Sequence, residues 1–92
     1  MPKPAKHDDF MVETIDDVDV TYRLVRTCGY SPSLKTHQSE LSWRATVGDR
    51  SFATVVRIPT GNPTFDQTMQ CIEDFLRPHA TMTLAMVKKG VL

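Results

Sequence analysis

The stretch SELSWRATVGDRSFATVVRIP (residues 39–59) alternates apolar and polar residues on both sides of Gly48-Asp49. Such alternation is typical of strands with one buried face, and a Gly-Asp pair suits a two-residue hairpin turn because glycine readily takes a positive φ. The turn fixes the register, since a slip of one residue would mix the two faces. One face is predicted to carry Leu41, Trp43, Ala45, Val47, Phe52, Thr54, Val56 and Ile58, and the other Ser42, Arg44, Thr46, Ser51, Ala53, Val55 and Arg57.

An amphipathic helix is predicted directly after this hairpin. Asn62-Pro63 can supply an N-cap and a proline at the first helical position, whereas Thr64 with Gln67 can form a capping box instead. Pro78 is expected to end the helix. A sheet with one apolar face needs a covering layer, so the apolar stripe of this helix is predicted to be core. The stripe comprises Phe65, Met69, Ile72, Phe75 and Leu76.

Two further strands are predicted before the hairpin. Residues 10–15, FMVETI, form a short strand, with a turn at Asp16-Asp17. Residues 18–29 alternate in the same way as the later hairpin, and Gly29 is expected to end that strand. A polar loop with Pro32 is expected to follow it.

These segments predict an α+β fold in a single domain, residues 1–92. An antiparallel sheet of three to four strands is followed by one or two C-terminal helices, which pack on one sheet face, expected to be that of a partner subunit. The tail, residues 79–92, has spacings that suit both strand and helix, and its Ala, Leu and Met content favours helix. Residues 1–9 are predicted to be a flexible arm.

Composition excludes several classes of protein. The chain has 92 residues, 40% of them hydrophobic and 24% charged, which is typical of a globular domain. No apolar run approaches the roughly 18 residues of a membrane span, and the polar N-terminus does not resemble a signal peptide. Cys28 and Cys71 are expected to be reduced, with a disulfide as the alternative. A core this small also makes a partner chain a plausible requirement.

The net charge of zero conceals an uneven distribution. Residues 1–20 carry two lysines and six carboxylates, whereas residues 21–60 carry six basic residues against Glu40 and Asp49. A basic middle segment suits contact with a polyanion, and it is equally compatible with a neutral protein that binds none.

The sequence contains no motif that is typical of a catalytic or metal site. His7, His37 and His79 are scattered, and neither cysteine lies at a metal-site spacing from a histidine. The TGNP segment lacks the glycines and the lysine of a phosphate-binding loop. We therefore predict a protein that is not an enzyme, with no catalytic residues, metal, cofactor or small-molecule substrate.

The order of antiparallel strands, then VVRIPTGNPTFDQTMQCIEDFL, then a short apolar tail resembles the C-terminal half of the coat proteins of single-stranded RNA bacteriophages (levivirus-like). The similarity covers residues 40–92 in pattern, with a weaker correspondence at VTYRLVR. It implies a capsid protein that forms homodimers and then a shell, packages single-stranded RNA, and resides in the virion and the host cytoplasm. In that family, helices lie across the partner's sheet, and the opposite face contacts RNA.

The residues expected to contact RNA follow from the alternation of the strands. Arginine, serine and threonine side chains on the face opposite the apolar one can bind phosphate and sugar. The alternative is a solvated face on which Arg57 pairs with Glu40. The candidate RNA-binding residues are Thr21, Arg23, Arg44, Thr46 and Arg57, and the helix stripe given above would form the dimer or core contact.

Two other functions suit the same features. A small phage-type inhibitor or regulator could bind one host protein through the acidic N-terminal segment and a sheet edge. A small nucleic-acid-binding module could use the sheet itself. Size separates these alternatives, because a coat forms particles of very high mass that contain nucleic acid.

Overall fold

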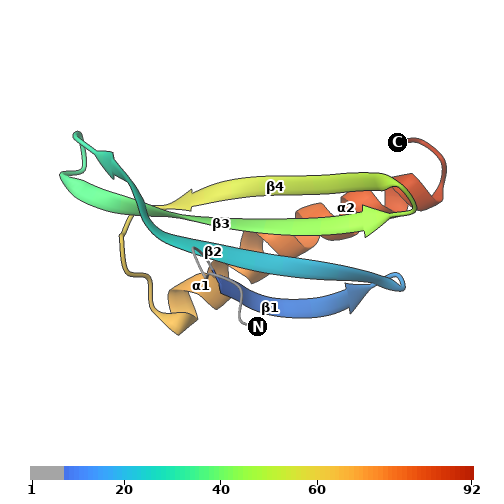
Figure 1. Cartoon of the computed structure of the whole chain (residues 1–92), viewed down its shortest axis with the longest axis horizontal. Helices are drawn as coiled ribbons and strands as arrows, with labels where there is room; N and C mark the ends of the chain where they lie inside the picture. Colours follow the sequence, from blue (N-terminus) through green and yellow to red (C-terminus); the bar gives the residue numbers. More distant parts are fainter. Residues whose placement is uncertain (1–7) are drawn as a thin grey trace, which may run out of the picture.

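The computed structural model describes residues 8–92 and contains a four-stranded antiparallel sheet followed by a C-terminal helix (Figure 1). The strands lie in the sheet in their sequence order, and the helix crosses one face of it diagonally. The predicted α+β fold class is therefore confirmed. The elements are β1 (Asp8–Ile15), β2 (Val18–Ser31), β3 (Thr36–Val47), β4 (Arg50–Ile58), α1 (Phe65–Cys71), the π-helical segment η1 (Ile72–Leu76) and α2 (Arg77–Lys88).

The β3–β4 hairpin has the register that its sequence predicts. Trp43 lies opposite Thr54, and Val47 lies opposite Arg50 across the two-residue turn. Gly48 has a φ of 64°, which explains why glycine occupies this position. The predicted turn between β1 and β2 is also present.

The strands extend further than the sequence indicated. β2 continues past Gly29 to Ser31, and β3 begins at Thr36, so most of the predicted polar loop belongs to a long hairpin. A bulge between Val25 and Gly29 interrupts its pairing. β1 begins at Asp8, within the predicted N-terminal arm; residues 1–7 of that arm lie outside the described residues.

The helix begins with the capping box, the second of the two predicted starts, so the predicted Asn62 N-cap is wrong, and the helix does not end at Pro78. The Gln67 backbone N–H donates to Thr64 Oγ1 over 3.0 Å, and the Thr64 N–H donates to Gln67 Oε1 over 2.8 Å. Beyond the cap the helix runs on to Lys88, so the prediction that Pro78 ends it is wrong, whereas the predicted helical tail is present. The wider turn of η1 ends at Leu76, two residues before Pro78, and gives room for a ring that would clash with a regular preceding turn.

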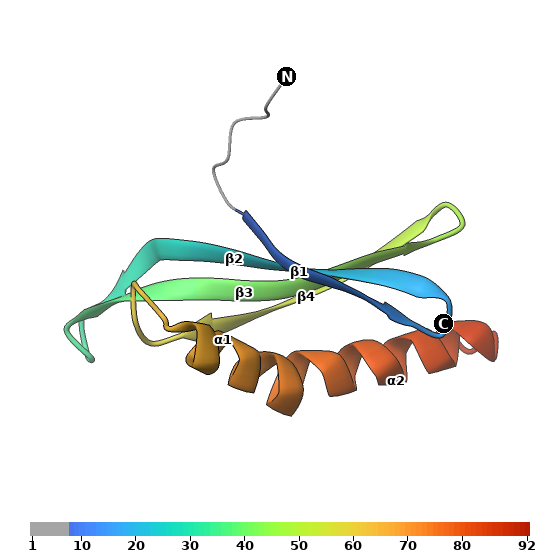
Figure 2. The same cartoon turned by 90° about the horizontal axis from the view of Figure 1, so that it is seen from below.

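The helix packs on the sheet of its own chain, not on that of a partner as the sequence led us to expect. Figure 2 shows it along one side of the sheet, and no other element within residues 8–92 covers the opposite side. The core joins the covered face of β2 and β3 to the helix. It comprises Val20, Tyr22, Leu24, Leu41, Trp43, Ala45, Ile58, Ile72, Leu76, Ala80 and Leu84.

The predicted helix stripe is correct in part. Ile72 and Leu76 are buried, and Met69 packs against the core. Phe65 and Phe75 are 67% and 60% exposed, so their assignment to the core is wrong. In a regular α-helix, with 3.6 residues per turn, residues four apart point in directions that shift steadily around the helix axis, so a row of them would leave the sheet. The π-helical turn of η1 holds more residues and shifts the direction back. The buried positions therefore recur every fourth residue, at Thr68, Ile72, Leu76, Ala80 and Leu84.

This packing predicts losses of stability of very different size for two neighbouring substitutions in η1. Leu76→Ala should lower the free energy of unfolding by about 2–5 kcal/mol, because it leaves a cavity in the core. Phe75→Ala should lower it by less than about 1 kcal/mol, because that ring is largely exposed. Urea denaturation of both variants measures the difference, and an equal loss would contradict the position of the π-helical segment.

Candidate nucleic-acid interface

The face of the sheet opposite the helix, which we call the open face, carries all five predicted RNA-binding residues. Along β2, Thr21 and Arg23 alternate with residues that are buried beneath the helix. Arg44 lies directly opposite Thr21 across β2 and β3. Thr46 and Arg57 follow the same alternation in β3 and β4.

Four of these five residues line one hollow in the open face. The hollow has a volume of about 660 Å³ and lies between the β1–β2 and β3–β4 turns. Arg57 lies outside it, toward the other end of β4. The predicted residues within it are Thr21, Arg23, Arg44 and Thr46.

The same hollow contains carboxylates that the sequence interpretation did not include. Asp9, Asp17 and Asp19 line it, and Arg23 Nε lies 3.2 Å from Asp9 Oδ1. The charge of the hollow is therefore mixed, with three carboxylates beside two guanidinium groups. Among the described side chains Arg44 forms no ion pair, and it is exposed. Arg44 is thus the arginine of the hollow best placed to receive a phosphate.

Arg57 forms the ion pair that was predicted as its alternative role. Its Nη2 lies 3.4 Å from Glu40 Oε2, and its Nη1 donates to Gln38 Oε1 over 3.4 Å. Both contacts are long and largely exposed, so they hold the guanidinium weakly. A phosphate at Arg57 would compete with a carboxylate that is already present.

The covered face has a partly buried polar cluster that links the helix to β1 and β2. Arg77 donates to Glu13 through Nε at 2.8 Å and through Nη2 at 2.9 Å, and the Tyr22 hydroxyl donates to the same carboxylate at 2.6 Å. The Arg77 hydrogen bonds, helped by that of Tyr22, lower the pKa of Glu13, although burial opposes the shift. Burial and then Glu13 raise the pKa of Tyr22. The cluster is a structural fastening on the side away from the hollow.

A second polar contact fastens the helix to β3. Trp43 is completely buried, and its Nε1–H donates to His79 Nδ1 over 3.1 Å. The two rings are 5.9 Å apart. The sequence placed Trp43 in the core correctly, but it gave no indication that His79 would satisfy its indole nitrogen.

The described cysteines are both free thiols, and they differ in exposure. Cys28 is a free, exposed thiol, and Cys71 is free and half-buried. Burial, and then Asp74, raises the pKa of the Cys71 thiol. Within residues 8–92, no three His, Cys, Asp or Glu side chains come together as a metal site, and no helix is long and apolar enough to cross a membrane.

Comparison of the chain with protein-family models, curated proteins and solved structures found no match. The similarity to phage coat proteins therefore depends on the pattern of the sequence alone. Any functional assignment has to come from the geometry of the open face and of the sheet edges.

The Glu13 cluster predicts a loss of stability in acid. Because Arg77 lowers the pKa of Glu13, the carboxylate stabilises the fold above the ordinary glutamate pKa, and this contribution disappears as the pH falls through the lowered value. Glu13→Gln should cost about 1 kcal/mol at neutral pH. The difference between wild type and variant should shrink between about pH 6 and about pH 3, as measured by urea denaturation. A difference that stays constant over this range would contradict a charged contact.

Proposed function

We propose that this chain is a structural, non-enzymatic protein that associates with copies of itself, first as dimers and then as a larger shell, and that binds single-stranded RNA on its open face. The observation that carries the proposal is the asymmetry of the sheet. One face is covered by the helix of the same chain, whereas the other presents arginine and hydroxyl side chains that no helix or strand of the described part of the chain covers.

The arrangement of charge favours a phosphate path along β3 and β4. Arg44, Thr46 and Ser51 also line a smaller hollow of about 290 Å³, which contains no carboxylate. Guanidinium and hydroxyl groups contact phosphate and sugar without reading the base sequence. The larger hollow is less suitable, because Asp17 and Asp19 would repel a phosphate there.

Self-association is supported by the edge formed by β4. Within residues 8–92 this strand pairs only with β3, and it has nine residues without a proline or a lysine. Val55 is 52% exposed on its open face, and Phe52 and Val56 are half-buried on the other. A long edge with apolar side chains can accept a strand from another chain, and a two-fold axis would pair β4 with its own copy.

The edge can be tested with two matched substitutions. Val55→Lys on β4 should convert the dimer to a monomer, because a lysine on an edge strand opposes further pairing. Val12→Lys is the control, since Val12 is 56% exposed, occupies the other edge strand and gains the same charge. Size-exclusion chromatography with light scattering measures the mass. A dimer that survives Val55→Lys but not Val12→Lys would move the interface to β1, and a monomeric wild type would contradict the assembly.

RNA binding can be tested with a second matched pair. Arg44→Gln should lower the slope of log affinity against log salt by about one unit, whatever the RNA sequence. Arg50→Gln is the control: Arg50 hydrogen-bonds the Leu92 carbonyl and lies over the Phe52 ring, away from the open face. The ultraviolet absorbance ratio of purified protein shows whether nucleic acid is bound. If the wild type has none, the coat assignment loses its main support.

In that event the edge of β4 favours the second candidate, a small inhibitor or regulator that pairs with a strand of a host protein. A monomer or dimer without nucleic acid would match this function. A dimer that binds RNA and forms no shell would instead match a small nucleic-acid-binding module.

A further inference from the structure

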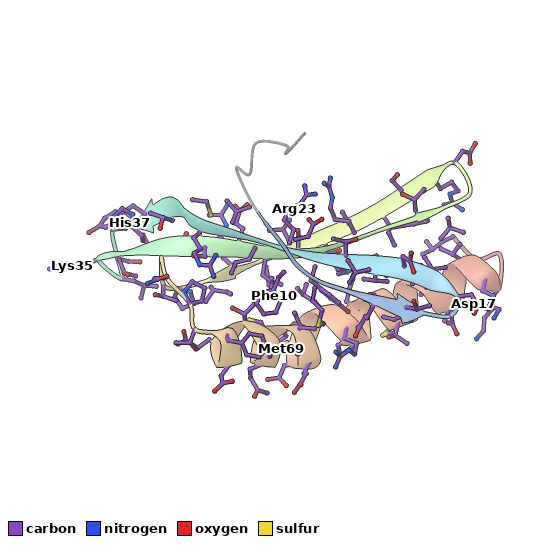
Figure 3. All side chains as sticks on the ribbon, turned by 60° about the horizontal axis from the view of Figure 1, so that its bottom comes forward. Phe10, Asp17, Arg23, Lys35, His37 and Met69 are labelled. Atoms are coloured by element: carbon purple, nitrogen blue, oxygen red, sulfur yellow. The ribbon has the colours of Figure 1, made fainter. Side chains whose placement is uncertain are left out.

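The tip of the β2–β3 hairpin, residues 27–37, projects beyond the N-terminal end of the helix (Figures 1 and 2). Large apolar side chains are exposed on it: Tyr30 is 53% exposed, and Leu34 is 57% exposed. Figure 3 places Lys35 and His37 at this same end. The core does not need these side chains.

The direction of the tip is fixed where it leaves the sheet. Thr27, at the bulge, has a φ of 54°, and its hydroxyl donates to the Gly61 carbonyl over 2.9 Å. Ser39 is completely buried, and its hydroxyl donates to the Thr60 carbonyl over 2.7 Å. The segment between β4 and α1 therefore holds the base of the hairpin, so the tip is oriented before any ligand arrives.

The aromatic ring at the tip is held in a defined position. The Tyr30 and His37 rings are 5.2 Å apart at 71°, an edge contact that supports one side of Tyr30. The turn itself is ordered by Ser31, whose hydroxyl lies 3.2 Å from that of Ser33 and accepts from the Leu34 N–H. Tyr30 thus presents an exposed ring on a supported base.

The charged residues of the segment that forms this hairpin tip are all basic. Residues 20–39 contain Arg23, Arg26 and Lys35 and not one Asp or Glu. Arg26 and Lys35 are both exposed. The hollow at the other end of β2, by contrast, contains three carboxylates. An exposed aromatic ring with flanking cations is the combination that binds single-stranded nucleic acid, by stacking on a base and neutralising its phosphates.

We propose that the tip of the β2–β3 hairpin is a base-stacking site for single-stranded RNA, in which Tyr30 stacks on a nucleobase while Arg26 and Lys35 contact the flanking phosphates. This site rests on the proposed RNA-binding function and extends it, because it adds a contact to the bases beyond the sheet. Stacking tolerates any base, so the site binds without sequence specificity.

The test uses a fluorescently labelled oligouridylate of about 12 nucleotides, long enough for several stacked bases. Tyr30→Ala should weaken binding about tenfold and leave the salt slope unchanged, because stacking releases no counterions. Tyr30→Phe should retain the affinity. Lys35→Gln should lower the salt slope by about one unit. Leu34→Ala is the matched control for a second exposed apolar side chain at the same tip, and it should bind like wild type.

A measurement on the wild-type protein needs no substitution. Cys28 is exposed near Tyr30, so bound RNA should slow its alkylation by iodoacetamide at least severalfold, with the half-buried Cys71 as the internal reference.

Wild type that binds RNA while Tyr30→Ala binds equally well would overturn the stacking site and leave the proposed function intact. A Tyr30→Ala variant with unchanged RNA affinity and lower particle mass would make the tip a protein contact. A wild type that binds no RNA would overturn both.

Discussion

The arrangement of the molecule depends on how two large buried aromatic side chains of the sheet satisfy their polar groups, one through Glu13 of β1 and one through His79 of the helix. Tyr22 and Trp43 are completely buried, yet each has a polar group that must find a partner. Arg77, through Glu13, and His79 reach these groups from the first turn of α2. Two contacts on opposite sides of one turn fix the rotation of the helix about its axis. That rotation puts Leu76 and Ala80 into the core and leaves Phe75 outside.

These contacts join the helix to the sheet of its own chain. The family pattern led us to expect a helix exchanged between subunits, whereas here the helix covers the sheet that precedes it. Self-association would then add contacts to a folded unit instead of completing it, so a dissociated chain should remain folded. The proposed β4 contact and the open face are surfaces of the folded chain. Side chains on both surfaces can be substituted without changing residues of the core.

The features that could be predicted from the sequence are those that depend on the local hydrophobic period and on the residues of turns and caps. The β3–β4 register followed from alternation and Gly48, and the capping box followed from Thr64 and Gln67. The sequence could not predict the π-helical segment, since a regular period was assumed, and Phe75 was therefore misplaced. Phe65 precedes that segment and is exposed at the start of α1, where its ring lies 5.4 Å from that of Phe10. The sequence interpretation also missed contacts between distant positions. Arg77 meets Glu13, 64 residues away, and Asp9 enters the hollow through pairing with β2.

Charged side chains are distributed unevenly along the length of β2. β2 has 14 residues in a molecule whose longest dimension is 43 Å, with Asp17 and Asp19 at one end of the strand and the acid-free hairpin tip at the other. A polyanion would be repelled at the first end and attracted at the second, with Arg44 between them. Since the charges balance overall, such binding would depend on placement of charge instead of net charge, and salt would weaken it quickly. An aromatic contact at the positive end would retain affinity when salt screens the phosphates, because stacking does not depend on charge.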